Sequence, residues 1–211
     1  MRHIGKGREP VEFTVWKTQG DANWNPGWDD FDGRPIKQVV KQSLMTEQGY
    51  LCCYCEKRAD DGTGHIEHLA PRHTYPDLQL AYENLLYCSA ESPKKQQATC
   101  GHARKPDDPV PVSPLQPDCE SRFLYTKLGS MAPRNEGDFD ARETVRILKL
   151  NDKLLRETRA GVYREVIQAH EEYSPAEFRR WMDLELQRDS NNMLQPYWGT
   201  KRYVMETMLT A

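Results

Sequence analysis

Hydrophobic residues recur every three or four positions in five stretches of the chain, which is the spacing of amphipathic helices. The five predicted helices cover residues 35–51, 141–150, 152–172, 175–188 and 196–209. The helix over residues 175–188 has clear start signals, because Ser174 can cap it and Pro175 stands at its first position. Most of the predicted regular structure is therefore helical.

Strand-like patterns are limited to short segments. Residues 11–15 and 123–128 are predicted as short strands. Gly62 and Gly64 mark a turn before Ile66, where we expect a short hairpin to begin. With the helices, these segments predict an α+β fold that is mostly helical.

The pattern divides the chain into three parts. Residues 1–33 are rich in Gly, Trp, Asn and Asp, and we expect an irregular N-terminal arm there. Residues 34–106 carry most of the cysteines and histidines, and we expect them to form one domain. Prolines are dense just after it, so residues 107–211 are predicted to form a stiff connector and a C-terminal helical subdomain. Three tryptophans could anchor the arm by packing on the core, or could contact a partner instead: Trp16, Trp24 and Trp28.

The composition is that of a polar protein. The formal net charge is -3, 29% of residues are charged and the mean hydropathy is -0.85. No apolar run approaches the roughly 20 residues needed to cross a bilayer, and the first residues show no apolar leader. We therefore expect a cytoplasmic protein with reduced cysteines and no membrane contact. The weak net charge by itself does not indicate a nucleic-acid-binding protein.

Four cysteines have positions that suit a structural zinc site. Cys52 and Cys55 form a C-x-x-C turn that can direct two sulfurs to one ion, and Cys88 and Cys100 can complete the four thiolates. The gap between Cys88 and Cys100 is much wider than in a standard second knuckle, so an insertion must separate them. In the alternative interpretation, Cys88 is only a small buried side chain. Cys53 has the wrong spacing to pair with Cys55 in that turn.

Histidine, glutamate and asparagine side chains lie between and beside these cysteines. His65-Ile66-Glu67-His68 precedes Asn84, and His102 follows the last of the four cysteines. Histidine suits the activation of water, while a carboxylate and a neutral imidazole suit a divalent ion; together they suggest phosphodiester cleavage. Neighbours on a strand point to opposite faces, so a bend or bulge is needed to use both Glu67 and His68 around one phosphate.

The sequence resembles the HNH endonucleases, the ββα-metal or His-Me finger group. Four segments carry the resemblance: Cys52-Cys53-Tyr54-Cys55, Glu67-His68-Leu69-Ala70-Pro71, Asn84-Leu85-Leu86-Tyr87-Cys88 and Cys100-Gly101-His102-Ala103-Arg104-Lys105. The resemblance implies a zinc-stapled ββα-metal nuclease core. It also implies cleavage of nucleic acid with a divalent ion, Mg²⁺ or another.

The same resemblance implies a role for each residue of the site. His68 is the expected general base, Glu67 a ligand of the catalytic ion, and Asn84 the side chain that fixes the loop holding His68. His102 is the expected second ligand, and His65 is a further candidate ranked below it. Two features depart from the family pattern: Glu67 replaces the more frequent Asp, and one glycine separates the last cysteine from His102.

The residues expected to contact nucleic acid are basic and lie in or near this motif. They are Arg72, Lys94, Lys95, Arg104 and Lys105. Residues 94–105 contain no acidic side chain, which suits phosphate binding, although a solvated loop is an alternative explanation.

Segments beyond the motif resemble a subgroup of HNH proteins that accompany retrons and Septu-type antiphage systems. These segments are residues 113–120, 123–125 and 142–151. In that subgroup the nuclease acts beside a separately encoded ATPase of the ABC/SMC type, so the resemblance implies such a partner. DNA is the favoured substrate and cleavage of tRNA is an alternative. A zinc-stapled module that binds nucleic acid or a partner without cutting is a second alternative.

Overall fold

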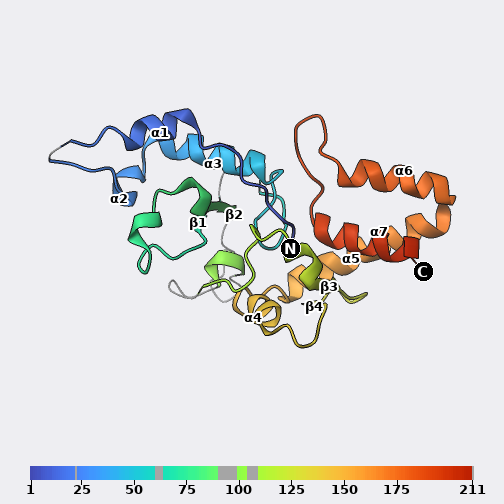
Figure 1. Ribbon diagram of the computed structural model, residues 1–211. Helices are drawn as coiled ribbons and strands as arrows, with labels where there is room; N and C mark the ends of the chain where they lie inside the picture. The colour runs from blue at the N-terminus through green and yellow to red at the C-terminus, as the bar shows by residue number, and fades with distance from the viewer. Residues whose placement is uncertain (22, 60–63, 90–98, 104–108, 211) are drawn as a thin grey trace.

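The structure is a computed structural model that describes residues 1–21, 23–59, 64–89, 99–103 and 109–210. It confirms a mostly helical α+β structure with two small antiparallel sheets (Figure 1). The helices are α1 (Val11–Lys17), α2 (Trp28–Phe31), α3 (Pro35–Glu47), α4 (Phe139–Ile147), α5 (Lys153–Glu172), α6 (Pro175–Leu186) and α7 (Trp198–Thr210). One sheet pairs β1 (His65–His68) with β2 (Leu85–Cys88), and the other pairs β3 (Phe123–Tyr125) with β4 (Met131–Pro133).

The strand predicted over residues 11–15 is wrong, because this segment forms helix α1. The helix places Phe13 and Trp16 on one face, and both side chains are buried. Their rings stack with centroids 6.0 Å apart, and each also contacts the ring of Phe31 in α2. The three-residue spacing of two aromatic side chains decides the local structure, against the β propensity of the valines and threonine beside them.

All five helices predicted from the hydrophobic spacing are present, with ends shifted by a few residues. The start of α6 is as predicted, because Ser174 caps it and the Ser174 N–H donates to the Glu177 carboxylate. Helix α3 ends earlier than predicted, since Gly49 and Tyr50 adopt φ values of 64° and 60° that no helix can include. That turn leads the chain directly into the cysteine loop.

Strand β1 pairs with β2, which lies well beyond it in the sequence. His65 lies opposite Cys88 and His68 lies opposite Leu85, across a connection that contains two short 3₁₀ helices. The predicted turn residue Gly62 lies outside the described residues. Gly64 is described, and it packs so closely on β2 that an added Cβ would lie 2.2 Å from the Cys88 carbonyl oxygen. A side chain at position 64 would therefore force the two strands apart.

The helix of the predicted ββα unit is not observed in the part of the chain that the structure describes. Between β2 and β3, the described residues contain the 3₁₀ helices Cys100–His102 and Cys119–Arg122 and no α-helix. Among the described residues after β2, a tight turn carries Cys100 and His102.

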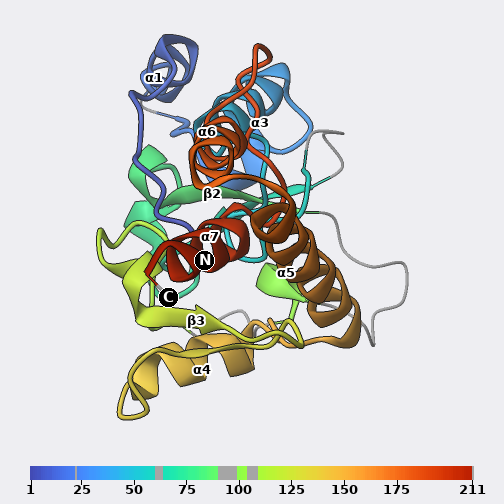
Figure 2. The ribbon, with the colours of Figure 1, turned by 90° about the vertical axis from the view of Figure 1, so that its right-hand side faces the viewer.

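Three clusters of buried side chains hold these elements together. The first joins the N-terminal arm to α3 and the β1–β2 sheet, and the second joins the cysteines to β3, α4 and the start of α5. The third lies among α5, α6 and α7. Helix α1 runs beside α3 in Figure 1, and Figure 2 shows α7 packed along α5. Among the described residues, no helix has the length and apolar character required to cross a membrane.

Glu56 ties the cysteine loop to helix α7. It follows Cys55 directly, and its backbone oxygen accepts a hydrogen bond from the Tyr197 N–H at 2.9 Å. Its side-chain Oε2 accepts from the Gly199 N–H at 2.6 Å. The other carboxylate oxygen lies 3.3 Å from the amino group of Met1, and both partners are buried. The start of α7 is therefore attached to the residue that closes the C-x-x-C turn.

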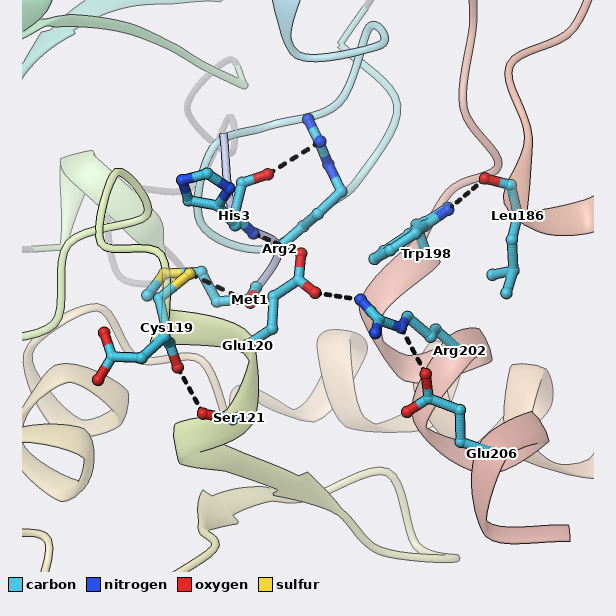
Figure 3. A network of polar contacts seen from close by, with 12 residues as sticks. Met1, Arg2, His3, Cys119, Glu120, Ser121, Leu186, Trp198, Arg202 and Glu206 are labelled. Atoms are coloured by element: carbon cyan, nitrogen blue, oxygen red, sulfur yellow. Dashed lines mark hydrogen bonds and ion pairs between the residues drawn. The ribbon is translucent and has the colours of Figure 1, made fainter. Parts of the chain in front are cut away.

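Further polar contacts attach the C-terminal helices to the first residues and to α3. Glu120 accepts a hydrogen bond from the His3 N–H at 2.7 Å and forms an ion pair with Arg202 of α7 (Figure 3). Arg188, which follows α6, donates to the Thr46 and Glu47 carbonyl oxygens at 2.7 and 2.6 Å. These carbonyls lie at the C-terminal end of α3, where a positive charge is favourable.

Candidate metal centre and active site

The loop that carries Cys52 and Cys55 is held by backbone and side-chain hydrogen bonds. The Cys52 N–H donates to Lys57 O at 2.9 Å, which closes a tight turn around both cysteines. The side chain of Gln48 is fully buried and bonds both the N–H and the carbonyl of Tyr87, at 2.7 and 2.8 Å. Because Tyr87 precedes Cys88, these bonds bring the end of β2 against the C-x-x-C turn.

The cysteine sulfurs form two buried groups that share Cys52: one with Cys55 and Cys100, the other with Cys53 and Cys88. The Sγ atoms of Cys52 and Cys88 are 3.7 Å apart, and those of Cys52, Cys55 and Cys100 all lie within 4.8 Å of one another. Four thiolates around one zinc ion at about 2.3 Å would have their sulfurs about 3.8 Å apart. The donor set and its spacing therefore fit a zinc ion. All four side chains are buried, which is typical of a closed structural site.

Cys53 is a fifth sulfur at this centre, and the sequence interpretation left it out. Its Sγ lies within 4.8 Å of those of Cys52 and Cys88, which form a second group around the same central cysteine. The spacing to Cys55 argued against Cys53, but its backbone N–H bonds Tyr87 O at 3.1 Å and brings it beside Cys88 instead. This bond joins the cysteine loop to β2, a contact between distant parts of the sequence that spacing along the chain cannot reveal.

The thiols differ in proton affinity. Burial raises the pKa of Cys52, but hydrogen bonds from Cys100, Cys53, Cys55 and Cys88 outweigh it and hold that pKa well below its ordinary value. Burial raises the pKa of Cys53 well above its ordinary value. Zinc ligands must be deprotonated, so Cys52 has the character of the central ligand; the pKa values of Cys55, Cys88 and Cys100 are raised like that of Cys53 and do not separate it from them.

A second cluster lies on one face of β1, where His65 and Glu67 project together. Glu67 Oε2 lies 3.2 Å from His65 Nε2, and Glu67 Oε1 accepts a hydrogen bond from the Tyr54 hydroxyl at 3.1 Å. The ring of His102 lies 4.1 Å from that of His65, centroid to centroid. Among the described residues, the buried Nδ1 of His65 has no hydrogen-bond partner. Three groups that can bind a divalent ion therefore lie side by side.

Gly101 allows this approach. A Cβ at position 101 would lie 2.4 Å from Glu67 Oε2, so only glycine leaves room for the carboxylate beside the Cys100–His102 turn. Gly101, which separates Cys100 from His102, thus has a steric role in the site. Tyr54, which lies between the cysteines of the first turn, was not among the predicted site residues although it stands within the quoted motif.

His68 lies at the end of β1, and its orientation is fixed. Its Nε2 lies 2.9 Å from the backbone carbonyl oxygen of Gln79. A carbonyl oxygen can only accept, so Nε2 carries a proton, and in the neutral form of the ring Nδ1 is the basic nitrogen. This is the tautomer that a general base needs. Gln79 lies far along the loop from His68, and no local spacing indicates the pair.

The side chain of Asn84 holds the segment that follows His68. Its Oδ1 accepts from the Ala70 N–H at 2.7 Å, and its Nδ2 donates to the carbonyl oxygens of Ala70 and Leu78 at 3.0 and 3.1 Å. Asn84 is buried, with 7% of its surface exposed, and its amide satisfies backbone groups of the loop that no neighbouring strand among the described residues bonds. Residues 70 and 78 are thereby tied to the start of β2.

The side chains of β1 and the Cys100–His102 turn border one cavity of about 490 Å³. Its lining includes His65, Glu67, His68, Gly101 and the exposed Arg72. His68 ends the strand, so it reaches the same cavity as Glu67 although the two leave β1 on opposite faces. Four other residues predicted to contact nucleic acid lie outside the described residues: Lys94, Lys95, Arg104 and Lys105.

Comparison with known proteins identifies two relatives of this chain. No protein-family model matches the sequence. A protein of Vibrio cholerae serotype O1 biovar El Tor, named "Retron Vc95 putative HNH endonuclease", is 35% identical over 108 residues, which cover 50% of this chain and 51% of that protein. The Septu protein PtuB of Bacillus thuringiensis is 26% identical over 117 residues, covering 54% and 42%. The chain thus spans about half the length of the curated relatives it matches. The resemblance predicted from the sequence, to HNH endonucleases of the retron and Septu type, is confirmed by these two relatives.

Proposed function

We propose that the chain is a divalent-metal-dependent HNH endonuclease that hydrolyses phosphodiester bonds of nucleic acid. The observation that carries the proposal is the shared cavity, where an oriented imidazole faces a group of ion-binding side chains. Cleavage needs an activated water and compensation of charge at the phosphate and the leaving oxygen. His68 suits the first requirement, and Glu67, His102 and His65 suit the second.

In the proposed reaction, His68 Nδ1 takes the proton from the attacking water. The Nε2–H remains bonded to the Gln79 carbonyl, and this bond stabilises the positive ring that results. A divalent ion such as Mg²⁺, when bound by Glu67, His102 and His65, would polarise the phosphate and stabilise the leaving oxygen. Asn84 keeps the loop in place, so that the base does not have to be ordered during the reaction.

The four-cysteine centre has a structural role in this proposal. Cys52, Cys55, Cys88 and Cys100 would bind one zinc ion and join the loop of the C-x-x-C turn, the end of β2 and the Cys100–His102 turn. The Cys100–His102 turn borders the catalytic cavity through Gly101, and β2 pairs with β1, which carries His65, Glu67 and His68. Arg72 at the cavity, with Lys94, Lys95, Arg104 and Lys105, is proposed to contact the phosphates of the substrate.

We further infer that the nuclease is the effector of a bacterial antiphage defence system. The names of the two relatives, one of a retron and one of a Septu system, support this role. We expect a separately encoded ATPase of the ABC/SMC type as its partner, with DNA as the substrate and tRNA as the alternative. The net charge of -3 provides little general attraction to phosphate, so the isolated chain should cut slowly until the partner delivers the substrate.

The test is a cleavage assay on labelled duplex DNA, single-stranded DNA and tRNA, with the ATPase encoded beside the chain present or absent. A strong chelator would remove zinc as well, so the ion-free control is zinc-loaded protein from gel filtration without added Mg²⁺. We expect cleavage only with Mg²⁺ or another added divalent ion, and faster cleavage with the ATPase. Absence of cleavage in every combination, with tight nucleic-acid binding retained, would instead indicate a binding module.

Replacing Gly101 with alanine should disturb the site without unfolding the protein. The new Cβ would clash with the Glu67 carboxylate at 2.4 Å, and that flexible group moves more easily than the backbone. We expect cleavage to fall roughly 10- to 100-fold, as when the support of a metal ligand is lost. Gly5→Ala is the matched control, since a Cβ there meets nothing within 4 Å. Full activity of Gly101→Ala, with unchanged thermal unfolding, would remove Glu67 from the proposed ligand set.

A further inference from the structure

Trp28 of the N-terminal arm lies directly against His68. The centroids of the two rings are 4.2 Å apart, and the rings meet edge to face at 75°. Trp28 is also 5.2 Å from the ring of Phe31, whose side chain is completely buried. Phe31 in turn contacts Phe13 and Trp16. The indole that touches His68 is therefore anchored in the aromatic cluster that holds the arm on α3.

Besides the direct ring contact, Gln79 provides a second connection between Trp28 and His68. The backbone N–H of Trp28 donates to Gln79 Oε1 at 3.2 Å, while the Gln79 carbonyl oxygen lies 2.9 Å from His68 Nε2. One residue thus binds the arm through its side chain and the imidazole through its backbone. A displacement of the arm would move both the ring that packs on His68 and the residue that fixes its tautomer.

The same indole also lies near two basic side chains, Arg72 and Lys37. The guanidinium carbon of Arg72 lies 4.9 Å from the centroid of the Trp28 ring, and Lys37 Nζ lies 5.8 Å from it. Cations are attracted to the face of an indole, so the ring restricts where the otherwise exposed Arg72 can reach. Arg72 lines the cavity together with His68.

We propose that Trp28 is a positioning residue that orients both His68 and Arg72 toward the scissile phosphate. The N-terminal arm is then part of the active site and completes it from outside the HNH motif. This inference rests on the proposed nuclease function for its kinetic consequence. The contact itself can be measured without any substrate.

The first experiment uses NMR on the zinc-loaded chain and needs no activity. Nitrogen chemical shifts of the His68 ring report its tautomer, and its proton shifts report the neighbouring indole. We expect the Nε2–H tautomer in the native chain and in Trp28→Phe, and a mixture of tautomers with displaced ring-proton shifts in Trp28→Leu. Unchanged His68 resonances in Trp28→Leu would overturn the proposal, even if the chain proves to cut nothing.

The second experiment compares cleavage kinetics of the same variants. Misplacement of a base by about 1 Å can cost on the order of 100-fold in rate, so we expect Trp28→Leu to lower kcat about 10- to 100-fold. Trp28→Phe should restore most of that loss, because an aromatic ring returns to both His68 and Arg72. KM should rise in Arg72→Gln and in Trp28→Leu, with no further rise when the two substitutions are combined.

Trp24→Leu is the matched control for folding of the arm. Trp24 lies in the same arm, where its side chain forms a hydrogen bond that lowers the pKa of Asp30. Among the described ring contacts, Trp24 has none with His68. The proposal requires Trp24→Leu to keep the native kcat and native His68 shifts. An equal loss in both variants would assign the effect to folding of the arm and overturn the proposal.

Discussion

Removal of zinc should abolish cooperative folding of the chain. The four predicted ligands connect the C-x-x-C loop, the end of β2 and the Cys100–His102 turn, and they lie inside the second buried cluster. Structural zinc sites bind with apparent free energies of about 10–16 kcal/mol, which rivals the total stability of a domain at about 5–15 kcal/mol. Without the ion, the buried thiols would have to be held by packing alone. We therefore expect loss of the cooperative thermal transition after chelation, followed by circular dichroism.

Elemental analysis and three serine variants make this prediction specific. The native chain should contain one equivalent of zinc, and Cys52→Ser should lose both the zinc and the thermal transition. Cys119→Ser is the matched control, because Cys119 is equally buried but its sulfur contacts the carbonyls of Met1 and Pro114 instead of the cluster. Zinc-free protein with an unchanged melting temperature would contradict the structural zinc site. Loss of zinc in Cys53→Ser would exchange Cys53 for one of the four predicted ligands.

His68→Ala should remove almost all cleavage while preserving zinc and fold. General-base catalysis contributes about 10²- to 10⁴-fold, and the proposed site offers His68 as the base whose tautomer the Gln79 carbonyl fixes. We expect a fall in kcat of that size in the Mg²⁺-dependent assay. His68 belongs to none of the three buried apolar clusters, so we expect the variant to keep the fold.

His170→Ala is the control for this substitution, since His170 is an exposed residue of α5 whose ring contacts only Phe178 among the described ring pairs. It should cleave at the native rate. Sequencing of nucleic-acid ends in cells that express the native or the His68→Ala chain would identify the substrate. Breaks confined to tRNA would overturn the preference for DNA, and native cutting by His68→Ala would refute the proposed base.

The long helices could be predicted because their information is local. Helices α5 and α6 combine apolar spacing with a capping residue just before them, Asp152 and Ser174, and both caps form as hydrogen bonds. Helix α1 could not be identified in this way, since its valines favour a strand. Its helical state depends on burying Phe13 and Trp16 against Phe31, a contact made across the arm. The pairing of β1 with β2 could not be predicted either, because a long connection separates the two strands.

The residues of the candidate site also divide into those that the sequence indicated and those that it did not. The histidines, Glu67 and Asn84 belong to a short motif, and the sequence placed them in one neighbourhood. The residues that orient them, Gln79 and Trp28, come from a loop and from the arm, where nothing in their spacing marks a role. Contacts of this kind are created by the fold, so they become visible only when the fold is known.

The attachment of Glu56 to the start of α7 has a consequence for how such chains can be recombined. Glu56 follows the C-x-x-C turn directly, yet its hydrogen-bond partners Tyr197 and Gly199 come from the far end of the sequence. A hybrid that grafts this motif onto other C-terminal helices would leave the buried Glu56 carboxylate without the Gly199 N–H and its backbone carbonyl without the Tyr197 N–H, which is costly. The motif and the C-terminal helices should therefore be inherited and exchanged as one unit, and shuffled chains should fold only when both come from the same parent.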